Sequence, residues 1–84
     1  MKTKQNQYHS QSTPQHPGLV LKEVLKDLEL GTEEVSKILG EYETGLIQLL
    51  EGEREMTIQI AVKLENLVNV PATFWMNRQR RYNG

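Results

Sequence analysis

The chain has 84 residues and a formal net charge of −1, with 37% hydrophobic residues and no cysteine. This length suffices for one small domain, and the absence of cysteine excludes disulfides and thiolate metal sites. No apolar run approaches the roughly 20 residues that span a bilayer. The polar start also lacks the apolar stretch of a signal peptide, so we expect a cytoplasmic protein that does not enter a membrane.

Charge is distributed unevenly along the chain. Residues 31–56 hold seven acids and two bases, for a net charge of −5, whereas residues 57–84 hold four bases and one acid, for +3. The near-neutral total therefore hides an acidic middle and a basic C-terminal segment. Such asymmetry indicates that the two parts have different surroundings or partners.

Residues 1–15 are rich in Gln, Ser, Thr and Asn and contain almost no large apolar side chain. Such a segment buries too little surface to offset the entropy of ordering it. We therefore expect a flexible tail over residues 1–15, followed by one folded domain over residues 16–84. The alternative is a short strand or arm that docks on a partner.

The first expected helix begins at Pro17, because proline suits a first helical turn where its missing N–H needs no partner. His16 is placed to cap this helix, and Gly31 is expected to end it. Apolar residues recur at spacings of three and four, as in an amphipathic helix: Leu21, Val24, Leu25 and Leu28.

A second, two-turn helix is expected to begin with Thr32 as its cap and to end at Gly40 in a left-handed conformation. Its expected apolar face consists of Val35, Ile38 and Leu39. A third helix is expected over residues 43–51, closed by Gly52, with Leu46, Leu49 and Leu50 facing inward. Two short helices joined by a glycine-containing turn are typical of a helix-turn-helix.

A fourth helix is expected after Thr57, which can cap it, and a fifth after Pro71. The expected apolar positions of the fourth helix are Ile58, Ala61, Val62, Leu64, Leu67 and Val68. The bulkiest apolar residues of the fifth helix are Phe74, Trp75 and Tyr82. No strand-like alternation is present, so the sequence predicts an all-α domain of five helices.

Four segments of the sequence resemble one known group of proteins. They are HPGLVLKEVLKDLEL at residues 16–30, LLEGER at 49–54, MTIQIAVKL at 56–64 and PATFWMNRQRRY at 71–82. Together with Gly40 they resemble the HigA-type antitoxins, which are Xre-like, lambda-repressor-like helix-turn-helix proteins. The HPG opening and the FW-x-N-x-Q-x-x-Y ending are more specific than the middle, which many helix-turn-helix proteins share.

The resemblance implies a homodimer that binds double-stranded operator DNA, represses its own transcription and neutralises a small ribonuclease toxin. By position, Thr32 and Glu33 would open the helix that crosses the DNA backbone. Glu43, Thr44, Ile47 and Gln48 would lie on the outward face of the recognition helix.

The sequence departs from the family mainly at this DNA face. The family commonly has a neutral polar residue where this chain has Glu33, and often has bases where it has Glu43, Gln48 and Glu53. Attraction between phosphate and Lys or Arg supplies most non-specific affinity for DNA. The acidic residues therefore predict weak or strongly salt-dependent binding. Gly45 within the recognition helix also costs about 1 kcal/mol relative to alanine.

Three outward residues each allow two interpretations. Gln48 can pair with adenine through two hydrogen bonds, or it can be a solvated side chain. Ile47 can contact a thymine methyl group or pack on a partner protein. Arg54 can bind a DNA phosphate, or it can form a surface ion pair with Glu51 or Glu55.

The fifth helix carries residues that suit a dimer or toxin interface, because aromatic residues and arginine are enriched in interfaces. Phe74, Trp75 and Arg78 are the candidates. Core packing is the alternative for the two aromatic residues. Arg78, Arg80 and Arg81 form a basic cluster that can meet phosphate, an acidic partner or solvent.

Nothing in the sequence indicates an enzyme or a cofactor. His9 and His16 are too few for a metal site, and no credible arrangement of nucleophile, base and acid is present. Two functions remain. The first is a DNA-binding antitoxin and repressor; the second is a protein-interaction module that keeps the fold but has lost most DNA affinity.

Overall fold

A computed structural model describes residues 15–84 of the chain. The tail expected over residues 1–15, and His9 within it, therefore lie almost wholly outside the described residues. In the described part the chain forms five helices: α1 (Pro17–Asp27), α2 (Thr32–Leu39), α3 (Glu43–Leu50), α4 (Ile58–Val68) and α5 (Ala72–Asn83). The all-α prediction is confirmed. None of these helices is long and apolar enough to cross a membrane.

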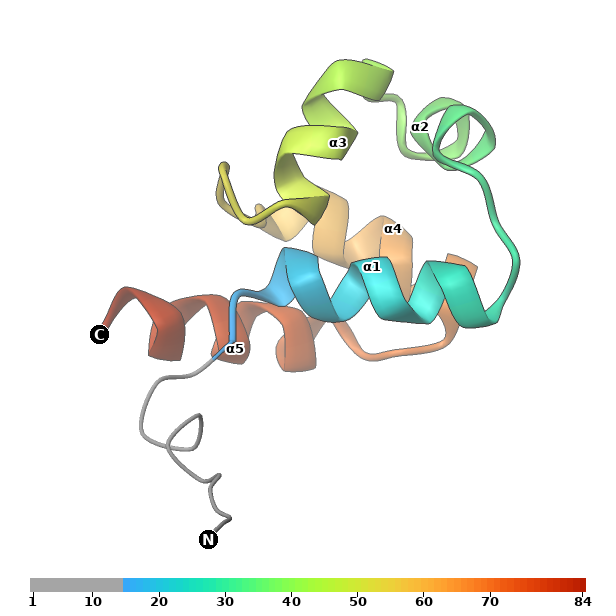
Figure 1. The fold of residues 1–84 in the computed structure, drawn as a ribbon. Coiled ribbons are helices and arrows are strands. Elements are labelled where there is room, and N and C mark those ends of the chain that lie inside the picture. Colours follow the sequence, from blue (N-terminus) through green and yellow to red (C-terminus); the bar gives the residue numbers. More distant parts are fainter. Residues whose placement is uncertain (1–14) are drawn as a thin grey trace, which may run out of the picture.

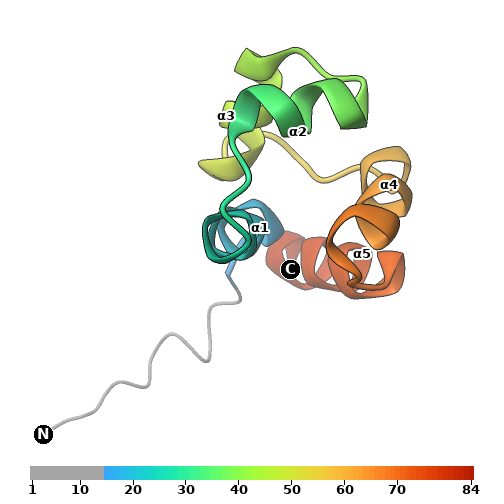
Figure 2. The same cartoon turned by 90° about the vertical axis from the view of Figure 1, so that its right-hand side faces the viewer.

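The helices form two groups. The pair α2–α3 lies on one side of the molecule and α5 on the other, with α1 and α4 between them (Figures 1 and 2). Helix α1 packs on α3 and α5, α2 packs on α3 and α4, and α4 packs on α5. The helix-turn-helix pair therefore rests on α1 and α4, and α5 supports those helices from the opposite side.

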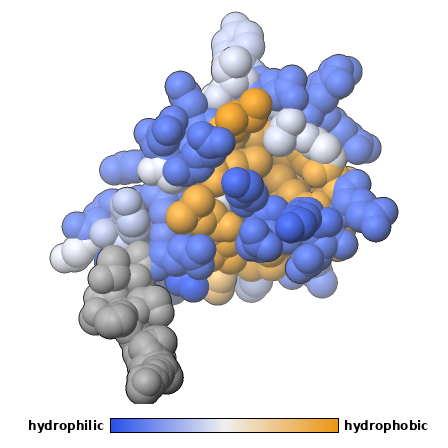
Figure 3. Space-filling view, in the orientation of Figure 1, coloured by the Kyte–Doolittle hydropathy of each residue, from blue (hydrophilic) through white to orange (hydrophobic). Residues whose placement is uncertain are grey.

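One hydrophobic core joins all five helices. Its buried apolar residues are Leu21, Leu25, Val35, Leu39, Leu46, Leu49, Leu50, Met56, Ile60, Ala61, Leu64 and Trp75. In the orientation of Figure 1, apolar atoms reach the surface in the middle of the molecule, ringed by hydrophilic side chains (Figure 3). The surface side of each helix remains largely hydrophilic, as its amphipathic sequence predicts.

Several helix boundaries agree with the sequence prediction. The His16 Nδ1 atom accepts a hydrogen bond from the Gly18 N–H at 2.8 Å, and the Thr57 hydroxyl accepts one from the Ile60 N–H at 3.3 Å. Both residues therefore cap their helices as expected. Gly40 and Gly52 follow α2 and α3 with φ of 68° and 76°, which confirms them as the expected helix ends.

Two expected boundaries around α2 are wrong. Gly31 does not end α1, which stops at Asp27; Glu29 makes the left-handed turn instead, with φ of 58°. Gly31 is the N-cap of α2, and Thr32 is its first helical residue. The Thr32 side chain therefore does not cap α2, because the residue stands one position inside the helix; its hydroxyl is bonded to another helix, as described below.

Six residues expected on apolar faces are half exposed: Leu28, Ile38, Ile58, Val62, Phe74 and Tyr82. The reason is the narrow width of each buried stripe. In α4 the core side is set by Ile60, Ala61 and Leu64, so Ile58 and Val62, four residues apart, share the opposite side. The sequence reasoning placed Ala61 and Leu64 correctly on the core side, but it wrongly added Ile58 and Val62 and missed Ile60.

Candidate nucleic-acid interface

The outward face of α3 is open over its whole length. Glu43, Thr44, Ile47 and Gln48 are all exposed, whereas the inward residues Leu46, Leu49 and Leu50 are buried. Sequence periodicity placed the inward face correctly, and the family resemblance placed the outward face correctly. In a helix-turn-helix the second helix enters the major groove and its N-terminal residues meet base edges. The arrangement of α2 and α3 is therefore suited to presenting these four side chains to DNA.

The inner side of α3 is fixed by a close contact with the start of α1. A Cβ atom on Gly18 would lie only 1.7 Å from the Leu49 carbonyl oxygen. Only glycine allows the two backbones to approach this closely. The HPG sequence thus caps α1 with His16, starts it with Pro17 and seats it on the C-terminal turn of α3 with Gly18.

The end of α2 is held by α4. The Lys63 ammonium donates a hydrogen bond to the Leu39 carbonyl oxygen at 2.8 Å, so it satisfies a backbone group that the helix end leaves open. The contact at Gly18 thus seats α3 on α1, and this bond holds α2 on α4.

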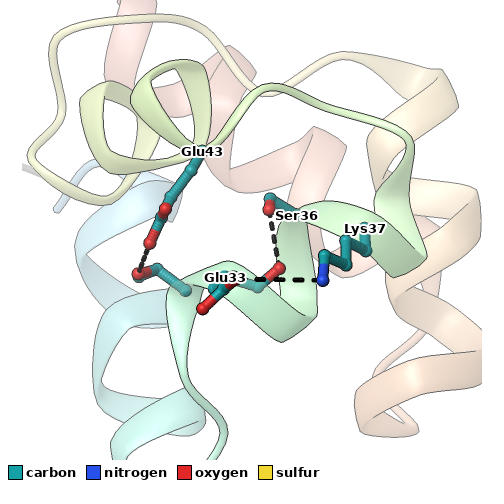
Figure 4. Close-up of polar contacts among 5 residues, drawn as sticks. Glu33, Ser36, Lys37 and Glu43 are labelled. Carbon is teal, nitrogen blue, oxygen red and sulfur yellow. Dashed lines mark hydrogen bonds and ion pairs between the residues drawn. The ribbon is translucent and has the colours of Figure 1, made fainter.

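The starts of α2 and α3 are joined by one short hydrogen bond. The Thr32 hydroxyl donates to the Glu43 Oε2 atom at 2.6 Å (Figure 4). Two residues expected to serve separate DNA contacts are thereby brought together. Glu33 lies beside them, and its carboxylate is 3.8 Å from the Lys37 ammonium, with both side chains 77% exposed.

Arg54 lies against α3 and forms an ion pair. Its Nη1 atom is 3.1 Å from the Glu41 Oε1 atom, so the expected pairing with Glu51 or Glu55 is wrong. The guanidinium crosses α3 at Gly45, where a Cβ atom would lie 2.6 Å from Nη1. Gly45 therefore has a structural purpose: it leaves room for Arg54 beside the recognition helix.

Proteins of known structure have the same arrangement of helices. A protein from Nostoc punctiforme, described as an antidote protein of a plasmid maintenance system, is 30% identical, with a TM-score of 0.77; the match covers 84% of this chain and 78% of that one. A protein from Coxiella burnetii, described as an addiction module antidote protein of a HigA family, is 29% identical, with a TM-score of 0.77; the match covers 84% of this chain and 78% of that one. The chain belongs to the Xre-like, HigA-type antitoxin family.

Another relative of known structure is the Pseudomonas aeruginosa antitoxin HigA, solved with the higBA promoter. It is 25% identical, with a TM-score of 0.76, and the match covers 83% of this chain and 77% of that one. The virulence-associated protein A' of Dichelobacter nodosus is 31% identical over 71 residues, which are 83% of this chain but only 62% of that protein. No family model matches the sequence.

In this HigA-type chain the basic cluster does not adjoin the recognition helix. Arg78, Arg80 and Arg81 all lie on α5, which packs on α1 and α4 on the side away from α2 (Figure 2). If the cluster meets phosphate, one of its three expected surroundings, that contact lies away from α3. Of the bases discussed for that role, Arg54 is the one that lies at α3.

The two neighbouring aromatic residues of α5 have different environments. Trp75 is 0% exposed and belongs to the core, whereas Phe74 is 40% exposed. The interface role considered for Trp75 and the core role considered for Phe74 are both wrong. The Arg78 guanidinium lies 5.6 Å above the Phe74 ring, and these two residues line a shallow groove of about 250 Å³ with Asn77 and Arg81.

Gln79 is a structural residue that the sequence reasoning missed. It is 4% exposed, and its Oε1 atom accepts a hydrogen bond from the Met56 N–H at 2.8 Å. It thereby ties the segment after α3 to α5. The available signal was its position four residues after Trp75, on the same side of the helix.

His16 lies between Gly52, in the segment after α3, and Tyr82 of the C-terminal helix. Its ring is 3% exposed and stands edge-on to the Tyr82 ring, with centroids 4.8 Å apart. Burial lowers the pKa of His16 below its ordinary value of 6.5, although the backbone of Arg54 and the charge of Glu55 act in the opposite direction. Within residues 15–84 no group of side chains is arranged to hold a metal ion.

Proposed function

We propose that this protein binds operator DNA as a homodimer, represses its own transcription and neutralises a small toxin. The observation that carries the proposal is the open outward face of α3, which rests on α1 and on α2, while α2 is held in turn by α4. Membership of the HigA-type family supports it, since one relative was solved with promoter DNA. The protein acts by binding rather than by catalysis, in the cytoplasm, and residues 16–84 form the binding domain.

The proposed DNA contacts divide by chemistry. Thr44, Ile47 and Gln48 would meet base edges, with Gln48 suited to adenine and Ile47 to a thymine methyl group. Thr32 and Glu33 stand at the start of α2 and would lie beside the phosphate backbone. Arg54 would contact a phosphate by giving up its ion pair with Glu41, in which the two side chains are 31% and 26% exposed.

The proposed dimer uses the outer side of α5. Phe74 and Arg78 form an exposed aromatic–arginine pair there, a combination enriched in protein interfaces. A twofold dimer would place its two recognition helices about 34 Å apart, one turn of DNA. Sedimentation at micromolar concentration, with and without duplex, measures the assembly. A monomer under both conditions would contradict this part of the proposal.

The DNA proposal is tested by fluorescence-anisotropy titration on the duplex upstream of the protein's own gene, at several salt concentrations. The wild type should bind at low salt and lose affinity steeply as salt rises, because phosphate contacts release counterions. A duplex of the same composition and shuffled sequence is the control. Equal affinity for the two duplexes would contradict operator recognition.

A second function is favoured by the acidic residues in and beside the helix-turn-helix pair. Glu33, Glu43 and Glu53 are exposed, and Arg54 is already paired with Glu41. The protein would then be an interaction module without appreciable DNA affinity. Replacing Glu43 and Glu53 by Lys separates the two functions. If these variants bind duplex and the wild type does not even at low salt, the interaction module replaces the repressor.

A further inference from the structure

Glu43 differs from the other acidic residues that make contacts around α2 and α3. Glu33 is 3.8 Å from the Lys37 ammonium and Glu41 is 3.1 Å from the Arg54 guanidinium. Glu43 is held instead by the neutral Thr32 hydroxyl at 2.6 Å. The hydrogen bond therefore fixes the position of the Glu43 carboxylate without neutralising its negative charge, because the partner is neutral. It also retains an oxygen, Oε1, for a further donor.

The position of Glu43 brings this oxygen to the start of the recognition helix. It is the first residue of α3 and its side chain is exposed. Figure 4 shows the Glu43 side chain extending from the start of α3 toward the start of α2. N-terminal residues of a recognition helix are those that reach base edges in the major groove.

The chemistry of a carboxylate limits which base it can face. A carboxylate only accepts hydrogen bonds, so guanine, with two major-groove acceptors, and thymine, with one acceptor and a methyl group, are unfavourable. Adenine offers its N6 donor beside the N7 acceptor, whereas cytosine offers the N4 donor without an adjacent acceptor. A fixed, charged Glu43 therefore favours cytosine.

We propose that Glu43 reads a cytosine in each half-site of the operator, and that Thr32 is a positioning residue that fixes the Glu43 carboxylate. This inference rests on the proposed function, because it requires α3 to enter the major groove. In this role Glu43 weakens the general affinity for DNA but determines the sequence preference.

The test is selection of bound duplexes from a randomised pool, followed by sequencing. The wild type should enrich a motif with cytosine at one fixed position per half-site, preferred over other bases by about 5- to 150-fold, the range of one good base contact. Glu43→Gln should change the preferred base at that position to adenine, because the amide both donates to N7 and accepts from N6.

Matched controls separate base readout from charge. Glu53→Gln removes the same charge from another exposed carboxylate, so it should raise affinity for all duplexes without changing the motif. Thr32→Val should weaken the cytosine preference by about 2- to 10-fold, the range of one net hydrogen bond. Thr32→Ser keeps the hydroxyl and should restore the preference, and thermal melting of each variant verifies its fold.

Three results would overturn the inference, and each identifies what failed. An unchanged cytosine position with Glu43→Gln means that another residue reads that base. Enrichment of no fixed cytosine, despite duplex binding by the wild type, means that α3 binds without Glu43 readout. Absence of binding to any duplex at low salt overturns the proposed function together with this inference.

Discussion

The inner and outer faces of α3 differ in how strongly the rest of the molecule constrains them. On the inner face Leu46 and Leu49 are 1% and 0% exposed, and the Leu49 carbonyl oxygen leaves no room for a side chain at position 18. On the outer face a single side-chain hydrogen bond, between Thr32 and Glu43, joins α3 to α2. The fold and the recognition surface can therefore change almost independently.

The largest expected effect concerns two adjacent residues on opposite faces of α3. Leu46→Ala should lower the free energy of unfolding by about 2–5 kcal/mol, because it leaves a cavity in the core. Ile47→Ala should change it by no more than about 0.5 kcal/mol, as is usual for surface substitutions. Urea denaturation followed by circular dichroism measures both. Equal losses would show that the two faces are not distinct.

A smaller effect is expected where α1 meets α3. Gly18→Ala should cost about 1–3 kcal/mol, the usual penalty of overpacking, because its Cβ atom would overlap the Leu49 carbonyl oxygen. Lys22→Ala, on the exposed side of α1, is the control and should be nearly neutral. If Gly18→Ala melts like the wild type, the close approach of the two helices does not constrain α3.

The pH dependence of the free energy of unfolding should test the same region, because His16 caps the start of α1. Since burial lowers the pKa of His16 below 6.5, the unfolded chain binds more protons than the folded one as pH falls through this value. Stability should therefore be full above about pH 6.5 and decrease as pH falls toward the lowered pKa. His16→Asn keeps a capping side chain that does not titrate. Melting temperatures between pH 7 and 5 should fall less for this variant than for the wild type.

Sequence reasoning predicted the fold well because the signals for helices are local. Proline and glycine marked the ends of most helices, and His16 and Thr57 were identified as caps. It failed where a side chain chooses between a local and a distant partner. Thr32 bonds to Glu43 rather than to its own helix, and Arg54 pairs with Glu41 rather than with a nearer glutamate.

The same limitation affects the choice of face. Phe74 and Trp75 are neighbours with similar side chains, and only the packing of α5 on α1 and α4 decides that Trp75 is buried. The position of the basic cluster away from α3 also depends on how the helices are arranged. Local sequence cannot supply that arrangement, since it results from contacts between residues far apart in the chain.

The central claim is that the outer face of α3, with Arg54 beside it, forms the DNA-binding surface. Its most direct test is the salt dependence of duplex affinity for Arg54→Ala beside the wild type, with Lys37→Ala as a control on the exposed side of α2. Each phosphate contact contributes roughly 0.9 to the slope of log affinity against log salt. Arg54→Ala should weaken binding to all sequences alike and flatten the slope by about one unit, while Lys37→Ala changes it less. An unchanged slope for Arg54→Ala, with wild-type affinity, would contradict this account of the DNA-binding surface.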